Sequence, residues 1–260
     1  MKTIVITGST KGLGFALATS FLEAGHRVII SGKNQHLLDQ AMQNLAFHQH
    51  RVSAKLCDVR NHQDIVNLWD FATTTWGEVD IWINNAGINQ QGAALWELSF
   101  DDIERVIQTN LQGMIYGTKV ALQGMLQQSH GQIYNVDGFG SDGMQRRGIN
   151  LYGTTKRALT HFTTACAKEA SHTPIQVGLL CPGMMITDLL RDETGHIRNE
   201  RQTKRIFNIL GDRPATVAKF FVPHILHNKK NGAHIVWLTK RKILWRFARS
   251  SFHQRDLFED

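Results

Sequence analysis

The sequence predicts an α/β fold in which helices cover both faces of a doubly wound parallel sheet of the Rossmann type. Two observations predict it. First, apolar, β-branched runs take turns with segments of helical period along the 260 residues. Second, the residues inside each run are apolar throughout and do not alternate with polar residues. The first pattern is typical of βαβ units and the second of strands buried on both faces. No linker, repeat or low-complexity tract divides the chain, so a single domain is expected.

The expected elements follow one another in the order that βαβ units require. Apolar, β-branched runs predict strands at 3–7, 27–31, 52–58, 79–84, 132–136, 175–180 and 234–238. Segments of helical period predict helices at 12–24, 35–47, 62–75, 101–128 and 151–170. In the first of these helices Leu13, Leu17 and Phe21 form one stripe, the spacing of a helix that packs one face on a sheet.

The composition narrows the class of protein further. Apolar residues make up 42% of the chain and charged residues 20%, which is enough for a large core and argues against global disorder. No apolar run approaches the roughly 18 residues that a membrane span needs. The chain opens directly on a strand-like segment, so no targeting peptide is expected. Three cysteines without a CxxC pair predict a reducing, cytoplasmic location and neither a disulfide scaffold nor a zinc finger.

The net charge of +7 is confined to the C-terminal fifth of the chain. Residues 1–212 carry 19 charges of each sign, whereas residues 213–255 hold ten basic residues and no acidic one. The body is therefore neutral, and nucleic acid is not an expected partner. We treat residues 241–260 as a basic tail. Packing of this tail on its own domain or on a neighbouring subunit is preferred to a peripheral membrane contact, since ordered tails usually dock on protein.

A glycine-rich turn links the first strand to the first helix. The turn runs from Thr7 to Gly14 as TGSTKGLG. Glycines allow the backbone to approach a pyrophosphate closely, and the N-terminus of the following helix offers unpaired N–H groups and the positive end of its dipole. An ordinary βα turn is the alternative, because a small glycine cluster by itself is weak evidence.

Four motifs in order carry a resemblance to the short-chain dehydrogenase/reductase family. They are the TGxxxGxG turn, Asn84-Asn85-Ala86-Gly87, Tyr152-x-x-x-Lys156 and Pro182-Gly183. The resemblance covers about residues 1–240. The stretches NVDGFGSDG, YGTTKRA and PGMMITDLL look like the chlorophyll(ide) b reductase branch, which uses NADPH to reduce a ring formyl group. We expect two departures from that branch, namely no plastid extension and an extra polar stretch at 191–205.

Residues at the end of the second strand favour NADP(H) over NAD(H). An acidic residue there would hold a ribose 2′-hydroxyl, but this chain has Ser31-Gly32-Lys33-Asn34. Lys33 and Lys11 would attract a 2′-phosphate, although both could be ordinary solvated lysines. The resemblance implies that Asp58 contacts the adenine ring. The expected cofactor-binding residues are Gly8, Thr10, Lys11, Gly12, Leu13, Gly14, Ser31, Lys33, Asn34, Asp58, Val59, Asn85, Ala86, Gly87, Tyr152, Lys156, Pro182, Gly183 and Thr187.

Tyr152 and Lys156 form the expected catalytic pair. Four residues apart on one helix, they share a face, and a cation one turn away stabilises a phenolate. Tyr152 could then give a proton to a carbonyl oxygen or take one from an alcohol. The resemblance implies that Lys156 also binds the nicotinamide ribose and that Asn110 props a water for proton relay. A polar kink in a long helix is the alternative for Asn110.

The serine of the family's catalytic set is displaced in this chain. Most relatives carry two serines directly after the fifth strand, where this chain has Asp137 and Gly138. The nearest hydroxyl is Ser141, which could orient the carbonyl if the glycine-rich loop bulges; a plain turn serine is the alternative. A redox-inactive relative that binds NADP(H) as a sensor or scaffold is therefore the rival to an enzyme.

The remaining expectations concern the substrate and the partners. By resemblance, residues 184–213 cover the substrate, a small-molecule aldehyde, ketone or alcohol, and apolar residues within that segment could wall its pocket. A homodimer or homotetramer is implied through the helices at 101–128 and 151–170. No HExxH or Cys/His ligand pattern is present, so no catalytic metal is expected.

Overall fold

The protein is described by a computed structural model that covers residues 1–90, 92–187, 200–250 and 255–258. Its centre is a seven-stranded parallel sheet in the order β3-β2-β1-β4-β5-β6-β7. The strands are β1 (Thr3–Ile6), β2 (Arg27–Gly32), β3 (Val52–Leu56), β4 (Ile81–Asn84), β5 (Gly131–Val136), β6 (Ile175–Cys181) and β7 (His234–Val236). The strand order reverses at β1, between β2 and β4, so the doubly wound prediction is confirmed. Ligands bind such sheets beyond the carboxyl ends of the strands at this reversal.

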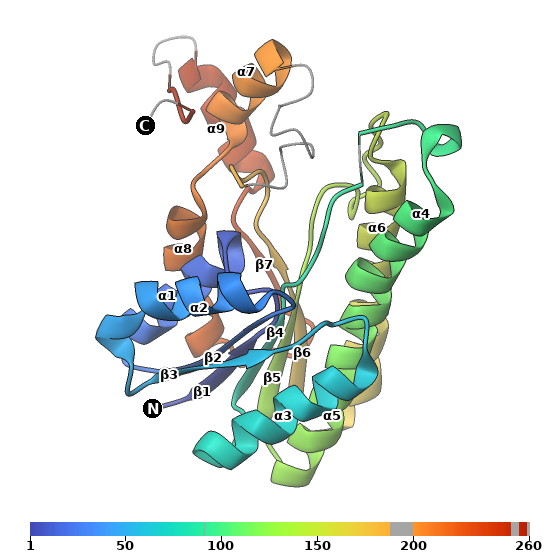
Figure 1. The fold of residues 1–260 in the computed structure, drawn as a ribbon. Coiled ribbons are helices and arrows are strands. Elements are labelled where there is room, and N and C mark those ends of the chain that lie inside the picture. Colours follow the sequence, from blue (N-terminus) through green and yellow to red (C-terminus); the bar gives the residue numbers. More distant parts are fainter. Residues whose placement is uncertain (91, 188–199, 251–254, 259–260) are drawn as a thin grey trace.

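Helices cover both faces of the sheet, as Figure 1 shows. One face packs against α1 (Gly12–Glu23), α2 (Gln35–Asn44) and α8 (Pro214–His227). The other packs against α3 (His62–Trp76), α5 (Gly113–Gln128) and α6 (Asn150–Glu169). Alternate residues of one strand serve the two cores: Ile4 and Ile6 join the first, and Val5 joins the second. Their burial on both sides explains why the strands read as apolar runs without alternation.

One predicted helix is interrupted. Where the sequence predicts a continuous helix over 101–128, the chain forms α4 (Phe100–Ile107), a π-helical turn at Gln108–Gln112, and then α5. Hydrophobic periodicity cannot reveal such a turn, because one extra residue per turn only shifts the stripe. π-Helical turns recur at functional sites, and this one contains Asn110.

Three helices were absent from the sequence-based prediction. They are α7 (Glu200–Leu210), α8 and α9 (Lys240–Ser250). Pro223 lies inside α8, and a proline there disfavours a helix in any local prediction. Burial of Val217, Phe221 and Ile225 against α1 outweighs that preference. Residues 188–199 of the expected substrate-covering segment lie outside the described residues.

The basic tail docks on its own domain through Asp212. Arg246, on α9, donates to the Asp212 carboxylate at 2.7 Å and to the Leu210 carbonyl at 2.8 Å. Trp237 Nε1 and Arg255 also donate to this carboxylate, at 2.6 and 3.2 Å. α7 and α9 stand together at one end of the molecule (Figure 1). Among the described helices, none is both long and apolar enough to cross a membrane.

Candidate active site

The glycine turn has the geometry of a backbone cradle. Gly8 and Gly12 have φ of +61° and +60°, a region that residues with a side chain rarely adopt. A Cβ on Gly8 would lie 2.7 Å from Ala86 Cα, so the turn also needs glycine for space. The N-cap residue of α1, Lys11, makes no side-chain capping hydrogen bond, so its side chain does not occupy the N–H groups at the start of the helix. The turn thus fits a pyrophosphate.

The segment after β4 braces this cradle. Asn85 Nδ2 donates to the carbonyls of Thr7 and Gly8, at 3.0 and 2.8 Å. The Thr7 hydroxyl accepts from the backbone N–H groups of Asn85 and Ala86. The Asn85 side chain, predicted to bind cofactor, is therefore engaged with the glycine turn. The motif joins the ends of β1 and β4 on either side of the reversal in strand order.

The end of β2 carries the residues that were expected to select the cofactor. Ser31 is buried and its hydroxyl lies 3.3 Å from the Ile6 carbonyl, while Asn34 Oδ1 caps α2 by accepting from Leu37 N. Leu13, also predicted, is in the core, so only its backbone and that of Ser31 remain for a dinucleotide. Lys33 is exposed and free of such a structural role.

Asp58 is engaged by a cation that the sequence analysis missed. Arg60 forms an ion pair with the Asp58 carboxylate at 2.6 Å. This hydrogen bond is the main reason that the pKa of Asp58 lies below its ordinary value, and Lys33 adds to the effect. Arg60 therefore brings a further positive charge to the Lys33 side of the site. The family motif includes Asp58 but not Arg60, so the sequence held no signal for the arginine.

The segment after β6 closes the site on the other side of the glycine turn. Thr187 Cγ2 lies 3.7 Å from where a Cβ on Gly12 would be, so the predicted Thr187 does face the turn. Gly183 has φ of +70°, and a Cβ there would lie 2.5 Å from Leu238 Cβ. The segment from Pro182 to Thr187 thus leads from the end of β6 to the start of α1.

Tyr152 and Lys156 lie in the first turns of α6, facing the end of β5. Lys156 is buried, its Nζ donates to the Val136 carbonyl at 2.9 Å, and it lies 5.7 Å from the centre of the Tyr152 ring. Burial lowers the pKa of Lys156 to about 8. Burial also raises the pKa of Tyr152 above its ordinary value, and the Asp137 carboxylate adds to this rise. At neutral pH Tyr152 is therefore a phenol and not a phenolate.

Asn110 joins the π-helical turn to the site. Its side chain exchanges two hydrogen bonds of 2.8 Å with the backbone of Ile88, and Nδ2 donates to the Thr155 hydroxyl at 3.3 Å. A Cβ on Gly87 would lie 3.5 Å from Asn110 Oδ1 and 3.9 Å from Lys156 Nζ. The structure therefore brings Asn110, Gly87 and Lys156 together. The Asn110 side chain is itself hydrogen-bonded to the Ile88 backbone and to Thr155.

Gly138 lies directly against the Tyr152 hydroxyl. A Cβ built on Gly138 would overlap that oxygen and come within 3.1 Å of Lys156 Cε. Ser141 lies three residues further on: its N–H bonds to the Gly138 carbonyl and its own carbonyl accepts from Arg157. The carbonyl-orienting role of Ser141 stays a prediction. The residue at the position nearest the tyrosine is a glycine.

A buried glutamine also positions Tyr152. Gln90 Oε1 accepts from the Tyr152 backbone N–H at 3.0 Å, at the start of α6. Gln90 is 4% exposed and also donates to Asn150 Oδ1. It follows the NNAG motif but matches no pattern of its own, so the sequence held no signal for it.

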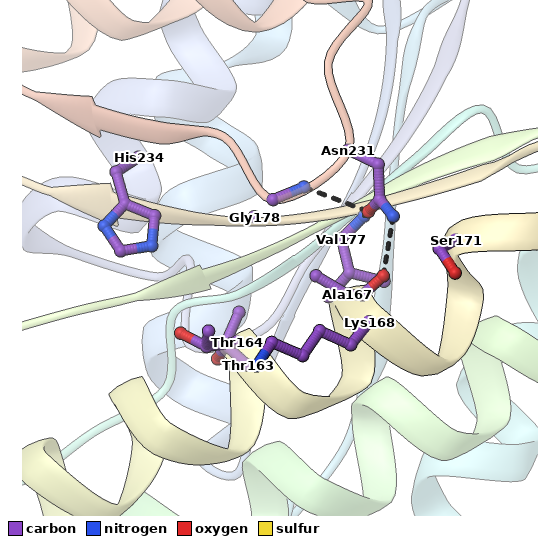
Figure 2. Close-up of a pocket in the computed structure, with 10 residues that line it drawn as sticks. Thr163, Thr164, Ala167, Lys168, Ser171, Val177, Gly178, Asn231 and His234 are labelled. Atoms are coloured by element: carbon purple, nitrogen blue, oxygen red, sulfur yellow. Dashed lines mark hydrogen bonds between the residues drawn. The ribbon is translucent and has the colours of Figure 1, made fainter.

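A surface hollow on α6 lies away from this site. Its volume is about 240 Å³, and it lies between α6, β6 and β7, as Figure 2 shows. Asn231 ties its walls together by donating to the Ala167 carbonyl at 2.7 Å and accepting from Val177 N at 3.0 Å. Its lining includes neither Tyr152 nor Lys156. In the described part of the chain, no three His, Cys, Asp or Glu side chains are grouped so as to hold a metal ion.

Comparison with known proteins identifies the class of protein that this fold and site define. Residues 2–197 match the short chain dehydrogenase family. In solved structures, the chain resembles an actinorhodin polyketide ketoreductase with NADPH (TM-score 0.79, 26% identity, 90% of this chain and 94% of that one). It equally resembles a serine dehydrogenase complexed with NADP+ (TM-score 0.79, 25% identity, 91% and 94%). The protein belongs to the short-chain dehydrogenase family.

Particular relatives within the family point to one branch. The chain is 35% identical to the probable chlorophyll(ide) b reductase NYC1 of Arabidopsis thaliana, over 100% of this chain and 55% of that protein. It is 36% identical to the chlorophyll(ide) b reductase NOL of Oryza sativa subsp. japonica, over 97% and 76%. An Escherichia coli NADP-dependent 3-hydroxy acid dehydrogenase is 31% identical over 70% and 72%. The chain thus spans only about half of the first of these relatives. The resemblance to the chlorophyll(ide) b reductase branch is confirmed.

Proposed function

We propose that this protein is an NADPH-dependent oxidoreductase that interconverts a carbonyl compound and its alcohol. The observation that carries the proposal is the juxtaposition of Tyr152 and Lys156 at the end of β5, beside the braced glycine turn at the reversal of strand order. Two solved relatives are described with NADPH or NADP+. The exposed cation Lys33, where NAD-binding sheets carry an acid, supports the phosphorylated dinucleotide.

The residues of the site fit NADP(H), and each of them has a defined part in binding or in proton transfer. The dinucleotide supplies the hydride that adds to the carbonyl carbon. The glycine turn and the N-terminus of α1 bind the pyrophosphate, and Lys33 and Lys11 bind the 2′-phosphate. Tyr152 donates the proton to the carbonyl oxygen, and the Lys156 cation stabilises the phenolate left behind. Asn110 fixes the backbone at Ile88, directly after the NNAG motif, through two hydrogen bonds.

The substrate that we propose is a formyl group on a large ring system. Two relatives over nearly the whole chain are chlorophyll(ide) b reductases by name, which supports an aldehyde of this kind. The test is the fall of NADPH absorbance with a panel of aldehydes that includes formyl porphyrins, with acetophenone-type ketones and 3-oxo acids as comparison classes. Turnover limited to the ketones or oxo acids would overturn the proposal of a formyl substrate but would still support a carbonyl reductase.

A sensor or scaffold that binds NADP(H) without turnover is the rival function. Gly138 in place of the serine next to Tyr152 motivates it, and the intact Tyr152, Lys156 and Asn110 oppose it. Calorimetric binding of NADPH together with no turnover on any substrate of the panel would favour the sensor.

We also propose a homo-oligomer in the cytoplasm. α5 and α6 are the helices through which relatives are expected to pair. The three cysteines are free thiols in the structure, which suits a reducing compartment. Light scattering on the purified chain tests the assembly, and a monomer at micromolar concentration would overturn it; localisation of a tagged chain in its own cells tests the compartment.

The outer face of α9 supports a second candidate function, a contact with an anionic membrane. This face exposes Leu244, Trp245 and Phe247 beside Lys240 and Arg241, while Arg246 points inward. Exposed apolar residues among cations are typical of interfacial helices. The wild-type chain should sediment with phosphatidylglycerol vesicles, and the Trp245→Ser/Phe247→Ser variant should stay in the supernatant. Phe47→Ser, a change of another exposed aromatic residue, is the matched control and should sediment like the wild type. Equal sedimentation of all three proteins would discard this contact.

A further inference from the structure

The hydroxyl of Tyr152 is not held in place by a hydrogen bond to any residue that the structure describes. Gly138, which lies against this hydroxyl, carries no side chain that could hold it. Lys156 lies 5.7 Å from the centre of the ring and uses its Nζ on the Val136 carbonyl. The direction of the Tyr152 side chain therefore depends on how firmly the backbone of the same residue is held.

One buried side chain holds the backbone N–H of Tyr152. Gln90 is 4% exposed, and its Oε1 accepts from Tyr152 N at 3.0 Å. Its Nε2 donates to Asn150 Oδ1, in the same turn of α6, and to the Ala93 carbonyl, both at 3.3 Å. Because the acceptor and the donors are at opposite ends of the amide, only one orientation of the Gln90 amide satisfies all three partners.

Gln90 also caps α6 from outside the helix. The N-cap residue of α6 is Ile149, which makes no side-chain capping hydrogen bond. The first N–H groups of a helix have no partner within it and are costly to bury without an acceptor. Asn150 Oδ1 accepts from Leu151 N at 2.8 Å, and Gln90 Oε1 accepts from the next N–H, that of Tyr152. The start of this helix is therefore fixed by a residue of the segment that follows β4.

The same segment holds the carbonyl of Tyr152 by a second route. This carbonyl accepts from the Thr155 hydroxyl at 2.7 Å, and that hydroxyl accepts from Asn110 Nδ2 at 3.3 Å. The Asn110 side chain is bonded in turn to the N–H and the carbonyl of Ile88, both at 2.8 Å. Since Ile88 and Gln90 are two residues apart, these hydrogen bonds close a ring through both backbone groups of Tyr152. In this ring Gln90 is the residue outside α6 that bonds to Tyr152 directly.

We propose that Gln90 is a positioning residue for proton transfer, which holds the backbone of Tyr152 so that the hydroxyl meets the carbonyl oxygen of the substrate. The inference rests on the oxidoreductase function proposed above. In that reaction the carbonyl carbon receives the hydride of NADPH, the Tyr152 O–H bond breaks, and the proton joins the carbonyl oxygen. Gln90 exchanges no proton or electron pair. Its effect comes from geometry, because a displacement of the donor by about 1 Å can slow such a step by about 100-fold.

The kinetic test separates the position of Tyr152 from the binding of the cofactor. Gln90→Met keeps the length of the side chain but removes the acceptor and the donors, whereas Gln90→Glu keeps an oxygen for Tyr152 N. We expect kcat per NADPH-binding site to fall by about tenfold or more in Gln90→Met and by about threefold or less in Gln90→Glu. The Kd for NADPH should stay unchanged in both. Gln90→Asn, which draws the amide back from Tyr152 N, takes the place of Gln90→Met if that variant does not fold.

Gln128→Met is the matched control. Gln128 also makes three hydrogen bonds, with the N–H and the carbonyl of Val79 and with the His130 carbonyl. It lies near the starts of β4 and β5, at the end of the sheet opposite to Tyr152, so we expect the wild-type kcat per NADPH-binding site. An unchanged kcat in Gln90→Met would overturn the proposal. So would an equal loss in Gln128→Met or in Gln90→Glu.

A measurement without turnover separates this proposal from the proposed function. Incorporated 3-fluorotyrosine gives a separate fluorine NMR signal for each of the three tyrosines, and Tyr152→Phe assigns the signal of Tyr152. In the NADPH-bound chain, Gln90→Met should move this signal and Gln128→Met should leave it in place. A moved signal in Gln90→Met supports the positioning role even if no substrate is turned over. A Tyr152 signal that stays in place in Gln90→Met refutes the role, whatever the activity of the wild-type chain.

Discussion

At the scale of residues, the site works through groups whose ordinary chemistry has been altered by burial. Lys156 has lost solvent and gained a backbone carbonyl, and its pKa has fallen to about 8. Tyr152 has been pushed toward the phenol. These shifts oppose the simple expectation of a lysine that lowers a tyrosine pKa. A bound dinucleotide in its oxidised form would add a positive charge and draw the phenol pKa back down.

Replacing the proposed acid should abolish turnover without abolishing binding. Tyr152→Phe removes only the hydroxyl, so carbonyl reduction should fall by about 100-fold or more while the Kd for NADPH changes little. Steady-state kinetics and fluorescence titration measure the two quantities, with Tyr116→Phe as control. A variant that keeps full activity would remove Tyr152 from the mechanism.

Reversing the charge at the end of β2 should change the choice of cofactor. In Lys33→Glu a carboxylate faces the 2′-phosphate, so the affinity for NADPH should drop by about tenfold or more while that for NADH holds or rises. Lys168→Glu, at the distant hollow of Figure 2, is the matched control. Equal losses in the two variants would show that net charge, and not this position, is responsible.

At the scale of elements, a buried polar network fixes α5 and α6 against the sheet. Trp82 Nε1 donates to Asn84 Oδ1 at 2.8 Å, and Asn84 Nδ2 donates to Asn135 at 2.8 Å and to Thr118 at 3.1 Å. Asn135 then donates to Thr163 on α6 at 2.9 Å. The same helix carries Tyr152 and Lys156, so this network sets the distance of the catalytic pair from β5.

Breaking the network at its centre should cost stability. Asn84→Ala leaves the Trp82 N–H without its acceptor in the core and removes one of the two donors to the Asn135 oxygen, which should lower the free energy of unfolding by about 1–3 kcal/mol. Urea unfolding measures it. Asn67→Ala, on the exposed surface of α3, should lower the free energy of unfolding far less. An equal loss in the two variants would show that the buried network does not stabilise the fold.

At the scale of the whole molecule, Asp212 connects parts of the chain that meet only in the folded state. Besides the side-chain contacts from Arg246, Trp237 and Arg255, its backbone pairs with Met184 and Ile186 after β6. The carboxylate is buried, and so is Arg246. The base of the predicted substrate-covering segment and the C-terminal helix are therefore held by one residue.

Removing this charge should loosen the C-terminal helix. Asp212→Asn leaves Arg246 buried without its anion, a loss of about 3–5 kcal/mol for a buried pair. Hydrogen exchange should accelerate in α9 and α7 while the strands stay protected. Asp39→Asn, an exposed acid on α2, should exchange like the wild type; slow exchange in α9 of Asp212→Asn would show that apolar packing alone holds the helix.

Local patterns in the sequence determined the class of fold, the order of elements, the glycine turn and the Tyr152–Lys156 pair, because each depends on periodicity or on spacing within one element. Tertiary structure alone decided the π-helical turn at Asn110, the ion pair of Asp212 with Arg246, and the helix formed around Pro223. It also decided that Gly138, and not Ser141, lies against the Tyr152 hydroxyl. The physical reason is that burial and charge act through space: the shifted pKa values of Tyr152 and Lys156 arise where the ends of strands meet, between residues whose separation along the chain shows no pattern.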